Sequence, residues 1–109
     1  MYFKKGVSLK DIQPQTYIAI CVAERQYHKY GYNLIVTSVN DGKHKKGSLH
    51  YKGLAVDIRI KNIMSDIGAK PIAAIEKLTD ILKNILCHLG YDVILELEKN
   101  HIHIEYDPK

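Results

Sequence analysis

The sequence predicts an α+β fold in which a small antiparallel sheet packs against two main helices. Three features support this prediction: two helical patterns lie far apart in the chain, β-type runs lie between them, and two further runs after the second helix form a hairpin pattern. The order helix, strands, helix, hairpin is typical of an α+β domain with an antiparallel sheet. A chain of 109 residues suits one domain spanning residues 1–109.

Both helices are predicted from apolar periodicity and from signals at their ends. The first covers about Pro14–Tyr30 and stops at Gly31, and the second covers Pro71–Leu89 and is followed by Gly90. The proline that opens the second helix suits the first helical position. The first helix carries adjoining apolar rows formed by Ile18, Ala19, Val22 and Ala23. The apolar stripe of the second helix consists of Ile75, Leu78, Leu82, Ile85, Leu86 and Leu89.

Four β-type runs are predicted to form the sheet. The first is Asn33–Ser38, which is followed by a polar loop over Val39–Tyr51. The second, Leu54–Ile60, has the sequence LAVDIRI and alternates, so that its leucine, valine and isoleucines share one face. The last two, Asp92–Leu97 and His101–Tyr106, are joined by the short turn EKN. This pair predicts the closing hairpin.

Composition narrows the possible partners without deciding between them. A hydrophobic content of 46% is enough for one core and argues against disorder. The net charge of +4 is spread along the chain, and it serves either solubility or attraction to a polyanion such as nucleic acid or the bacterial cell wall. Cys21 and Cys87 fall in apolar helical patterns, which predicts buried free thiols, with a disulfide between them as the alternative.

Two clusters of potential metal ligands interrupt these patterns. In the first, His50 precedes the LAVDIRI strand, Asp57 lies on its polar face, and Gly53 lets the chain bend between them, so the two side chains can converge. In the second, HIHIEYD, His101 and His103 share one face of a strand. A catalytic zinc site needs about three N/O ligands and one open position. His50, Asp57 and one strand histidine supply that set, although two histidines and one carboxylate also suit iron.

The stretch SLHYKGLAVD, Ser48 to Asp57, resembles the S-x-H-x-x-G-x-A-x-D signature of zinc-dependent D-Ala-D-Ala peptidases. This family includes DD-carboxypeptidases and phage L-alanyl-D-glutamate endopeptidases, and it shares its fold with the Hedgehog signalling domain. HIHIEYDP resembles the family's last metal-binding strand. The resemblance covers about Pro14 to Pro108 and implies a zinc metallopeptidase that hydrolyses peptidoglycan stem peptides.

The resemblance also implies a role for individual residues. His50, Asp57 and His103 would be the zinc ligands, and Ser48 would help to hold the substrate. The family's general base stands three residues before the last histidine, where this chain has Asn100, which cannot accept a proton from water.

Other acidic and histidine side chains must therefore be considered for catalysis. Glu98, in the turn before the histidine strand, is the predicted replacement for the base, and Glu96 is the second choice. His101 is predicted to stabilise the oxyanion, and His44 to contact a substrate carboxylate.

The N-terminal stretch MYFKKGVSLKD has no apolar segment of the signal-peptide type, and no apolar run approaches the length needed to span a membrane. Together with the family resemblance, these features predict a phage or prophage protein of the host cytoplasm or virion that acts at the bacterial cell wall. Two alternatives stay open. One is a non-catalytic zinc-binding module for wall binding or assembly, and the other is a basic nucleic-acid-binding domain using Tyr27, Tyr30, Tyr32 and Lys29.

Overall fold

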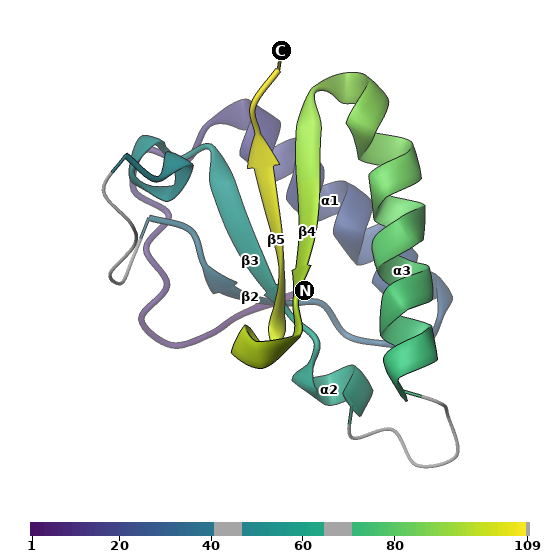
Figure 1. Cartoon of the computed structure of the whole chain (residues 1–109). Helices are drawn as coiled ribbons and strands as arrows, with labels where there is room; N and C mark the ends of the chain where they lie inside the picture. The colour runs from purple at the N-terminus through teal and green to yellow at the C-terminus, as the bar shows by residue number, and fades with distance from the viewer. Residues whose placement is uncertain (41–46, 65–70, 109) are drawn as a thin grey trace.

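A five-stranded sheet runs through the centre of the protein, and two helices pack on one side of it (Figure 1). The computed structural model describes residues 1–40, 47–64 and 71–108. The strand order is β1-β2-β3-β5-β4. The strands are β1 (Tyr2–Phe3), β2 (Ile35–Ser38), β3 (Ala55–Arg59), β4 (Tyr91–Glu96) and β5 (His101–Tyr106).

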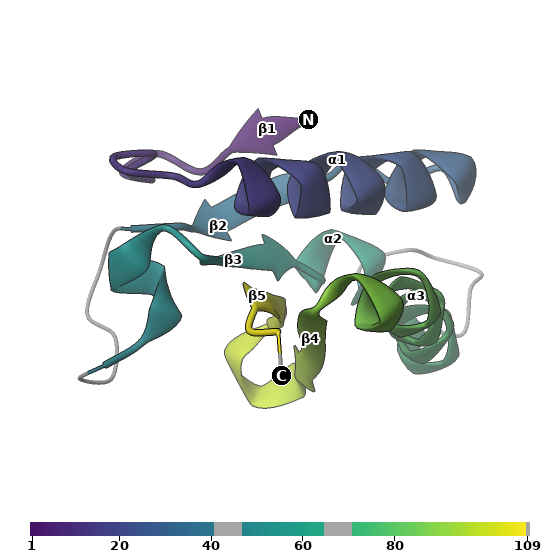
Figure 2. The same ribbon diagram turned by 90° about the horizontal axis from the view of Figure 1, so that it is seen from above.

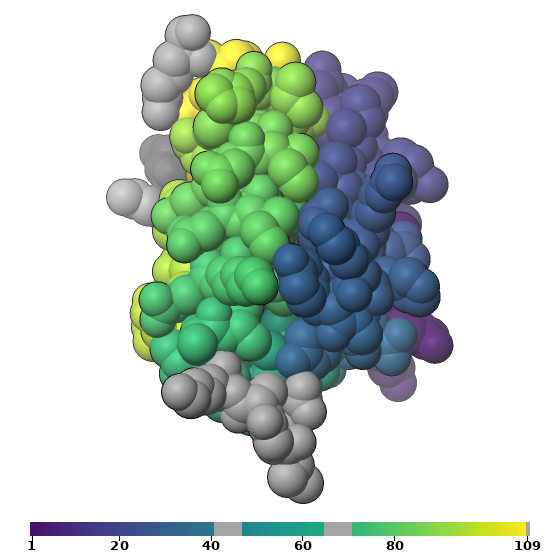
Figure 3. Space-filling view, turned by 90° about the vertical axis from the view of Figure 1, so that its right-hand side faces the viewer, coloured from purple at the N-terminus to yellow at the C-terminus, as the bar shows by residue number. Residues whose placement is uncertain are grey.

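The main helices are α1 (Pro14–Lys29) and α3 (Pro71–Leu86), and a short helix, α2 (Lys61–Met64), follows β3. Three 3₁₀ turns complete the fold: η1 (Leu49–Lys52), η2 (Cys87–Leu89) and η3 (Leu97–Lys99). Seen from above, α3 lies to one side of β4 and β5 (Figure 2). Figure 3 shows that side of the molecule, where α3 in green packs along α1 in blue. Among the described residues, no helix has the length and apolar character needed to cross a membrane.

Alternation along the two central strands separates the core from a polar face. Val56 and Ile58 of β3, with Ile102 and Ile104 of β5, are buried in the hydrophobic core with the apolar side chains of α1 and α3. The intervening residues therefore point to the opposite face of the sheet. Asp57 stands directly across from His103 in the antiparallel register of β3 and β5. The register alone thus places a carboxylate beside an imidazole on the face away from the helices.

A buried tyrosine ties the first helix to the strand that carries Asp57. The Tyr27 side chain is fully buried, and its hydroxyl donates a hydrogen bond of 2.9 Å to the backbone carbonyl of Arg59. Burial raises the pKa of the Tyr27 hydroxyl far above its usual range. The predicted role of Tyr27 in nucleic-acid stacking does not fit this position, because its ring is not accessible to a base.

The sheet is mixed, which corrects the prediction of an antiparallel sheet. β1 pairs in parallel with β2, whereas the β2–β3, β3–β5 and β4–β5 pairs are antiparallel. β1 is only two residues long, and a strand that short carries no period that a sequence pattern can detect. The α+β class and the two main helices are confirmed.

The buried stripe of α1 is rotated from the predicted one. Ala19 and Ala23 are buried as predicted, but Ile18 is 50% exposed, and the buried set also includes Thr16, Ile20 and Tyr27. Both cysteines are free and exposed, so the prediction of buried thiols is wrong. Cys21 falls outside the buried stripe of α1, and Cys87 lies in η2, beyond the last turn of α3.

The predicted ends of the helices agree with the structure to within a turn. α1 ends at Lys29, and Gly31 follows with a positive φ of 83°. The second helix is α-helical to Leu86 rather than Leu89, and its last three predicted residues form η2 before Gly90, whose φ is 94°. Because the helix ends earlier, Leu89 does not join the core and is 56% exposed.

Candidate metal centre

The short turn η1 holds His50 in place from both ends. Ser48 is the N-cap of this turn, and its hydroxyl accepts a hydrogen bond of 3.2 Å from the His50 backbone N–H. Gly53 is the C-cap, and its N–H donates to the His50 carbonyl at 3.0 Å. The serine and glycine of the SLHYKG motif therefore fix the backbone on both sides of the histidine.

Gly53 is required by its conformation and by its neighbours. Its φ is 70°, in the left-handed region that favours glycine, and a Cβ there would clash with the backbone carbonyl of Asp11. The Gly53 carbonyl accepts hydrogen bonds from the Thr16 hydroxyl at 2.6 Å and from the Gln13 N–H at 3.1 Å. The turn before β3 is thereby packed against the beginning of α1.

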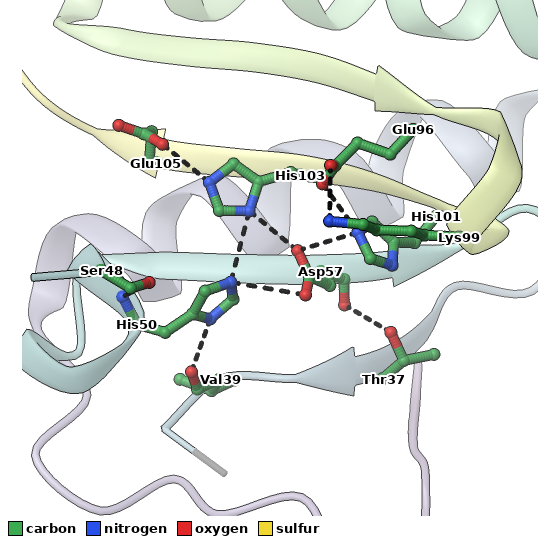
Figure 4. A network of polar contacts seen from close by, with 10 residues as sticks. All are labelled: Thr37, Val39, Ser48, His50, Asp57, Glu96, Lys99, His101, His103 and Glu105. Atoms are coloured by element: carbon green, nitrogen blue, oxygen red, sulfur yellow. Dashed lines mark hydrogen bonds and ion pairs between the residues drawn. The ribbon is translucent and has the colours of Figure 1, made fainter. Parts of the chain in front are cut away.

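His50, Asp57 and His103 converge on one point on the polar face of the sheet (Figure 4). His50 and Asp57 are buried, at 2% and 5% exposure, and His103 is half-buried. His50 Nε2 lies 3.3 Å from His103 Nδ1 and 3.4 Å from Asp57 Oδ2, and His103 Nδ1 lies 2.9 Å from Asp57 Oδ1. Each residue offers one ligand atom, and these atoms all lie within 4.8 Å of one another, so the cluster can hold a metal ion.

Hydrogen bonds outside the cluster orient the His50 and His103 rings, so that one ring nitrogen of each faces this point. The Val39 carbonyl, 2.6 Å from His50 Nδ1, can only accept, so Nδ1 carries a proton and Nε2 faces His103 and Asp57. His103 Nε2 lies 2.8 Å from Glu105 Oε1, which leaves Nδ1 as the nitrogen that faces Asp57. A histidine ligand whose other ring nitrogen donates to a carbonyl or carboxylate is the usual arrangement in protein metal sites.

Hydrogen bonds and charges within the cluster shift the pKa values of Asp57 and His103 in opposite directions. Burial alone would raise the pKa of Asp57, but hydrogen bonds with His103 and His50, together with the positive charge of His50 and His101, hold it well below its usual range. Burial would lower the pKa of His103, but hydrogen bonds to Asp57 and Glu105 raise it. The protonated His103 ring can thus donate from Nδ1 to Asp57 and from Nε2 to Glu105. A metal ion bound at this point would replace the proton on Nδ1.

A second pair of side chains adjoins the cluster. His101 Nε2 lies 2.9 Å from Glu96 Oε1 and 3.6 Å from Asp57 Oδ1. The Lys99 ammonium lies 3.3 Å from the other Glu96 oxygen. Burial would raise the pKa of Glu96, but hydrogen bonds from His101 and Lys99 lower it, so the carboxylate stays ionised. Asp57, Glu96 and His101 form a second group whose ligand atoms lie within 4.8 Å of one another.

The other predicted site residues lie in different surroundings. Glu98 is an exposed residue of η3, whereas Glu96, the second choice, is half-buried against His101. Asn100 is the C-cap of η3 with a φ of 58°, a left-handed conformation that asparagine tolerates well. Ser48 is bonded to the His50 backbone, and His44 lies outside the described residues.

Two groups that hydrogen-bond to the cluster, from Val39 and Thr37, could not be identified from the sequence pattern. The Val39 carbonyl is a backbone group, which no sequence pattern identifies as a hydrogen-bond acceptor. The Thr37 hydroxyl donates to the Asp57 carbonyl at 3.3 Å and links β2 to β3 beside the site. Glu105 was detectable, because in a strand it shares a face with His103 two residues earlier.

The three residues predicted to bind metal therefore lie together, and they come from η1, β3 and β5. Asp57 is buried, so it is not a solvated residue on an exposed face of its strand. A scan against protein families and a search of curated protein sequences both find no match to this chain. What this centre does must therefore be inferred from its own residues and their geometry.

Proposed function

We propose that this protein is a zinc-dependent peptidase that hydrolyses peptide bonds in peptidoglycan stem peptides. The observation that carries the proposal is the convergence of His50 Nε2, His103 Nδ1 and the Asp57 carboxylate in a mostly buried cluster. Two histidines and one carboxylate are a usual protein ligand set for catalytic zinc. The sequence around them supports the choice of substrate through its resemblance to the zinc D-Ala-D-Ala peptidases and their Hedgehog-like fold.

The donor spacing fits zinc. Ligand atoms at about 2.0–2.2 Å from a tetrahedral ion are about 3.3–3.5 Å from one another. The separations of His50 Nε2 from His103 Nδ1 and from Asp57 Oδ2, at 3.3 and 3.4 Å, fall in this range. His103 Nδ1 and Asp57 Oδ1 are closer, at 2.9 Å, and are joined by a hydrogen bond. Zinc held here would polarise the scissile carbonyl and activate a water molecule.

The chain's own groups supply the proton transfers. We place the proton acceptor at Glu96 rather than Glu98, because Glu96 is ionised, half-buried and held by His101 beside Asp57. A base must be unprotonated and within reach of the water proton. We assign to His101, whose Nε2 lies 3.6 Å from Asp57 Oδ1, the stabilisation of the negative charge that develops on the carbonyl oxygen. Glu105 and Val39 keep the ligand histidines oriented.

Two measurements test the proposal. Metal analysis of the purified protein should find one zinc per chain, which the His50→Ala/His103→Ala double variant no longer binds. Mass spectrometry of a peptidoglycan digest should show cleaved stem peptides and new free amines. Release of reducing sugar ends without new amines would contradict the peptidase proposal.

The second candidate is a non-catalytic zinc-binding module for wall binding or assembly. The observation that favours it is Asn100, which occupies the position of the expected base and has a left-handed backbone conformation that suits the turn. Under this alternative, the protein would bind zinc and peptidoglycan without hydrolysing either peptide or glycan. A zinc-loaded wild type that releases no amine from peptidoglycan, but sediments with it, would establish this function instead.

A further inference from the structure

β4 is the last strand at one edge of the sheet, and part of its backbone has no partner strand (Figure 1). The Asp107 N–H donates to the Gly90 carbonyl at 3.0 Å, which continues the antiparallel register of β4 and β5 by one hydrogen-bonded pair. Such pairs alternate along a ladder, so the N–H and C=O groups of Val93 and Leu95 point away from β5. Across residues 1–40, 47–64 and 71–108, no other group forms a hydrogen bond with them.

This edge lacks the features that usually protect an edge strand. β4 has six residues in unbroken register with β5, and its sequence, YDVILE, contains no proline and no lysine. Ile94, in the middle of the strand, is 47% exposed and lies opposite His103, on the face of the sheet away from the helices. Prolines, lysines, bulges or a covering segment normally prevent an edge from pairing with another chain. The β4 edge is therefore suited to accept a further strand.

A groove of about 410 Å³ lies beside the edge. Lys83 and Asn84 of α3 and Cys87 of η2 form one wall, and residues 91–94 of β4 form the other. Successive side chains of a strand point to opposite faces of the sheet. A strand added here would thus direct every second side chain toward α3, where the groove provides space, and the others to the face that carries Ile94.

Negative charge lies at one end of the same edge. Asp92, Glu105 and Asp107 offer carboxylate oxygens that lie within 4.8 Å of one another. Like charges this close repel, and a cation beside them lowers the electrostatic energy. In an added strand, the residue opposite Asp92 lies two positions from the residue opposite Ile94, and both point to the same face. The edge therefore favours a segment in which a basic residue stands two positions from an apolar one.

We infer that the free edge of β4 binds an extended segment of another protein, which adds to the sheet antiparallel to β4. The segment places an apolar side chain against Ile94 and a basic side chain against Asp92. Main-chain hydrogen bonds to Val93 and Leu95 hold the segment, and the two side-chain contacts select it. The inference does not depend on the proposed peptidase activity, because none of the three residues of the candidate metal centre belongs to β4.

A second copy of this chain fits the edge less well. In the antiparallel register that centres two β4 strands on Ile94, Asp92 of each copy would lie opposite Glu96 of the other. Like charges directly opposite each other destabilise strand pairing. β1, at the other edge of the sheet, has only two residues and offers few backbone groups to pair with β4. A segment with a basic side chain avoids both problems.

NMR titration of the ¹⁵N-labelled protein tests the inference without an activity assay. The probe is the peptide N-acetyl-Thr-Val-Thr-Lys-Thr-amide, which should shift the amide signals of Val93 and Leu95 saturably, because these N–H groups form the new hydrogen bonds. Methylation of the backbone nitrogen of the central threonine should abolish binding, since that nitrogen then cannot donate to β4. Glutamate in place of the lysine should weaken binding about fivefold, because a cross-strand attraction becomes a repulsion.

Substitutions in β4 test the same contacts from the protein side. Ile94→Lys should abolish binding of the lysine peptide, because it removes the apolar contact and adds a repelling charge at the edge. Its matched control is Ile18→Lys, at a 50% exposed position of α1, which should bind as the wild type does. Asp92→Asn should reduce the preference for lysine over glutamate to less than about twofold. Asp80→Asn, at an exposed position of α3, should keep that preference.

Several outcomes would overturn the inference. Unchanged binding of the N-methylated peptide would show that main-chain pairing is not involved. Equal binding of the lysine and glutamate peptides by the wild type would contradict the charge selection, and full binding by Ile94→Lys would place the peptide elsewhere. Broadening of the Val93 and Leu95 signals with protein concentration, without peptide, would identify a second copy as the occupant instead.

Discussion

His50 uses its two ring nitrogens for different purposes. Nδ1 donates to the Val39 carbonyl at 2.6 Å, and this bond fixes both the tautomer and the direction of the ring. Nε2 is then left to face His103 and Asp57. His103 is oriented in the same manner by Glu105, but through a charged carboxylate, which also makes the ring more basic.

The first prediction concerns the Glu105 carboxylate. Glu105→Gln should weaken zinc binding about tenfold or more, because a neutral amide supports the His103 ring less well than a carboxylate does. The measurement is a competition titration against a chelator of known affinity. Asp107→Asn is the control, because it removes the same charge at an exposed position two residues away. Equal losses in the two variants would show that general charge, rather than ring orientation, sets the affinity.

The second prediction separates the two candidate bases. Glu96→Gln should reduce kcat by about 10²–10⁴-fold on a stem peptide, since general-base catalysis contributes that much, while the zinc content stays unchanged. Glu98→Gln should have little effect, because Glu98 is exposed on η3. Steady-state kinetics with metal analysis of each variant tests this. If Glu98→Gln loses activity and Glu96→Gln does not, Glu98 is the base. If neither variant loses activity, His101 becomes the candidate base.

At the scale of elements, the site depends on how η1 meets β3 and β5. The register that pairs Asp57 with His103 brings two residues of the candidate metal centre together across neighbouring strands. The third residue, His50, comes from η1, which Ser48 caps and Gly53 ends. Because Gly53 also bonds to Gln13 and Thr16, the position of His50 is tied to the beginning of α1.

The third prediction tests that connection. Gly53→Ala should destabilise the protein by more than Gly47→Ala, although both residues have positive φ values, of 70° and 82°. Each alanine bears a backbone strain of about 1–2 kcal/mol. Gly53→Ala also brings its Cβ against the Asp11 carbonyl, whereas a Cβ at Gly47 has no described neighbour within 4 Å. The clash should add at least about 1 kcal/mol.

Urea denaturation of both variants, with m-values compared, measures the difference. Gly53→Ala should also bind zinc more weakly than wild type, because the turn that holds His50 must shift. Equal stability of the two alanine variants would mean that the start of α1 moves away from Gly53 without cost, and that it does not hold the site.

At the scale of the whole molecule, the protein has the compactness of one small globule. Its radius of gyration is 13.1 Å, close to the value of about 13 Å expected for a compact chain of this length. Its core is formed on one face of the sheet by α1 and α3, and the candidate metal centre lies on the other face. Small domains bury a modest fraction of their surface, so a bound ion can add a large part of their stability.

The fourth prediction is that zinc raises the melting temperature strongly. An ion present at about 1,000 times its Kd adds about 4 kcal/mol. For a domain of this size, this corresponds to a rise of more than about 10 °C. Calorimetry with zinc and with a chelator measures the shift, and the His50→Ala/His103→Ala double variant should show none. A rise of the same size in that variant would place the stabilising ion elsewhere.

Local patterns were sufficient to predict the α+β class, the two main helices and the residues of the buried cluster His50, Asp57 and His103. Period 3.6 located α1 and α3, and Gly31 and Gly90 marked their ends. Period 2 in β5 put His101 and His103 on one face. The spacing of the SLHYKGLAVD motif placed His50 and Asp57 where they could converge, because the glycine between them permits a tight turn.

Long-range contacts settled what those patterns left open. The parallel pairing of β1 and the rotated stripe of α1 depend on which surfaces meet, and the periodicity of α1 did not distinguish Ile18 from Ile20. Likewise, the sequence ranked Glu98 above Glu96, but the hairpin register sets Glu96 opposite His101 and leaves Glu98 exposed on η3. Side-chain chemistry can be read along the chain, whereas the distances that make a site are set by packing between segments that are remote in sequence.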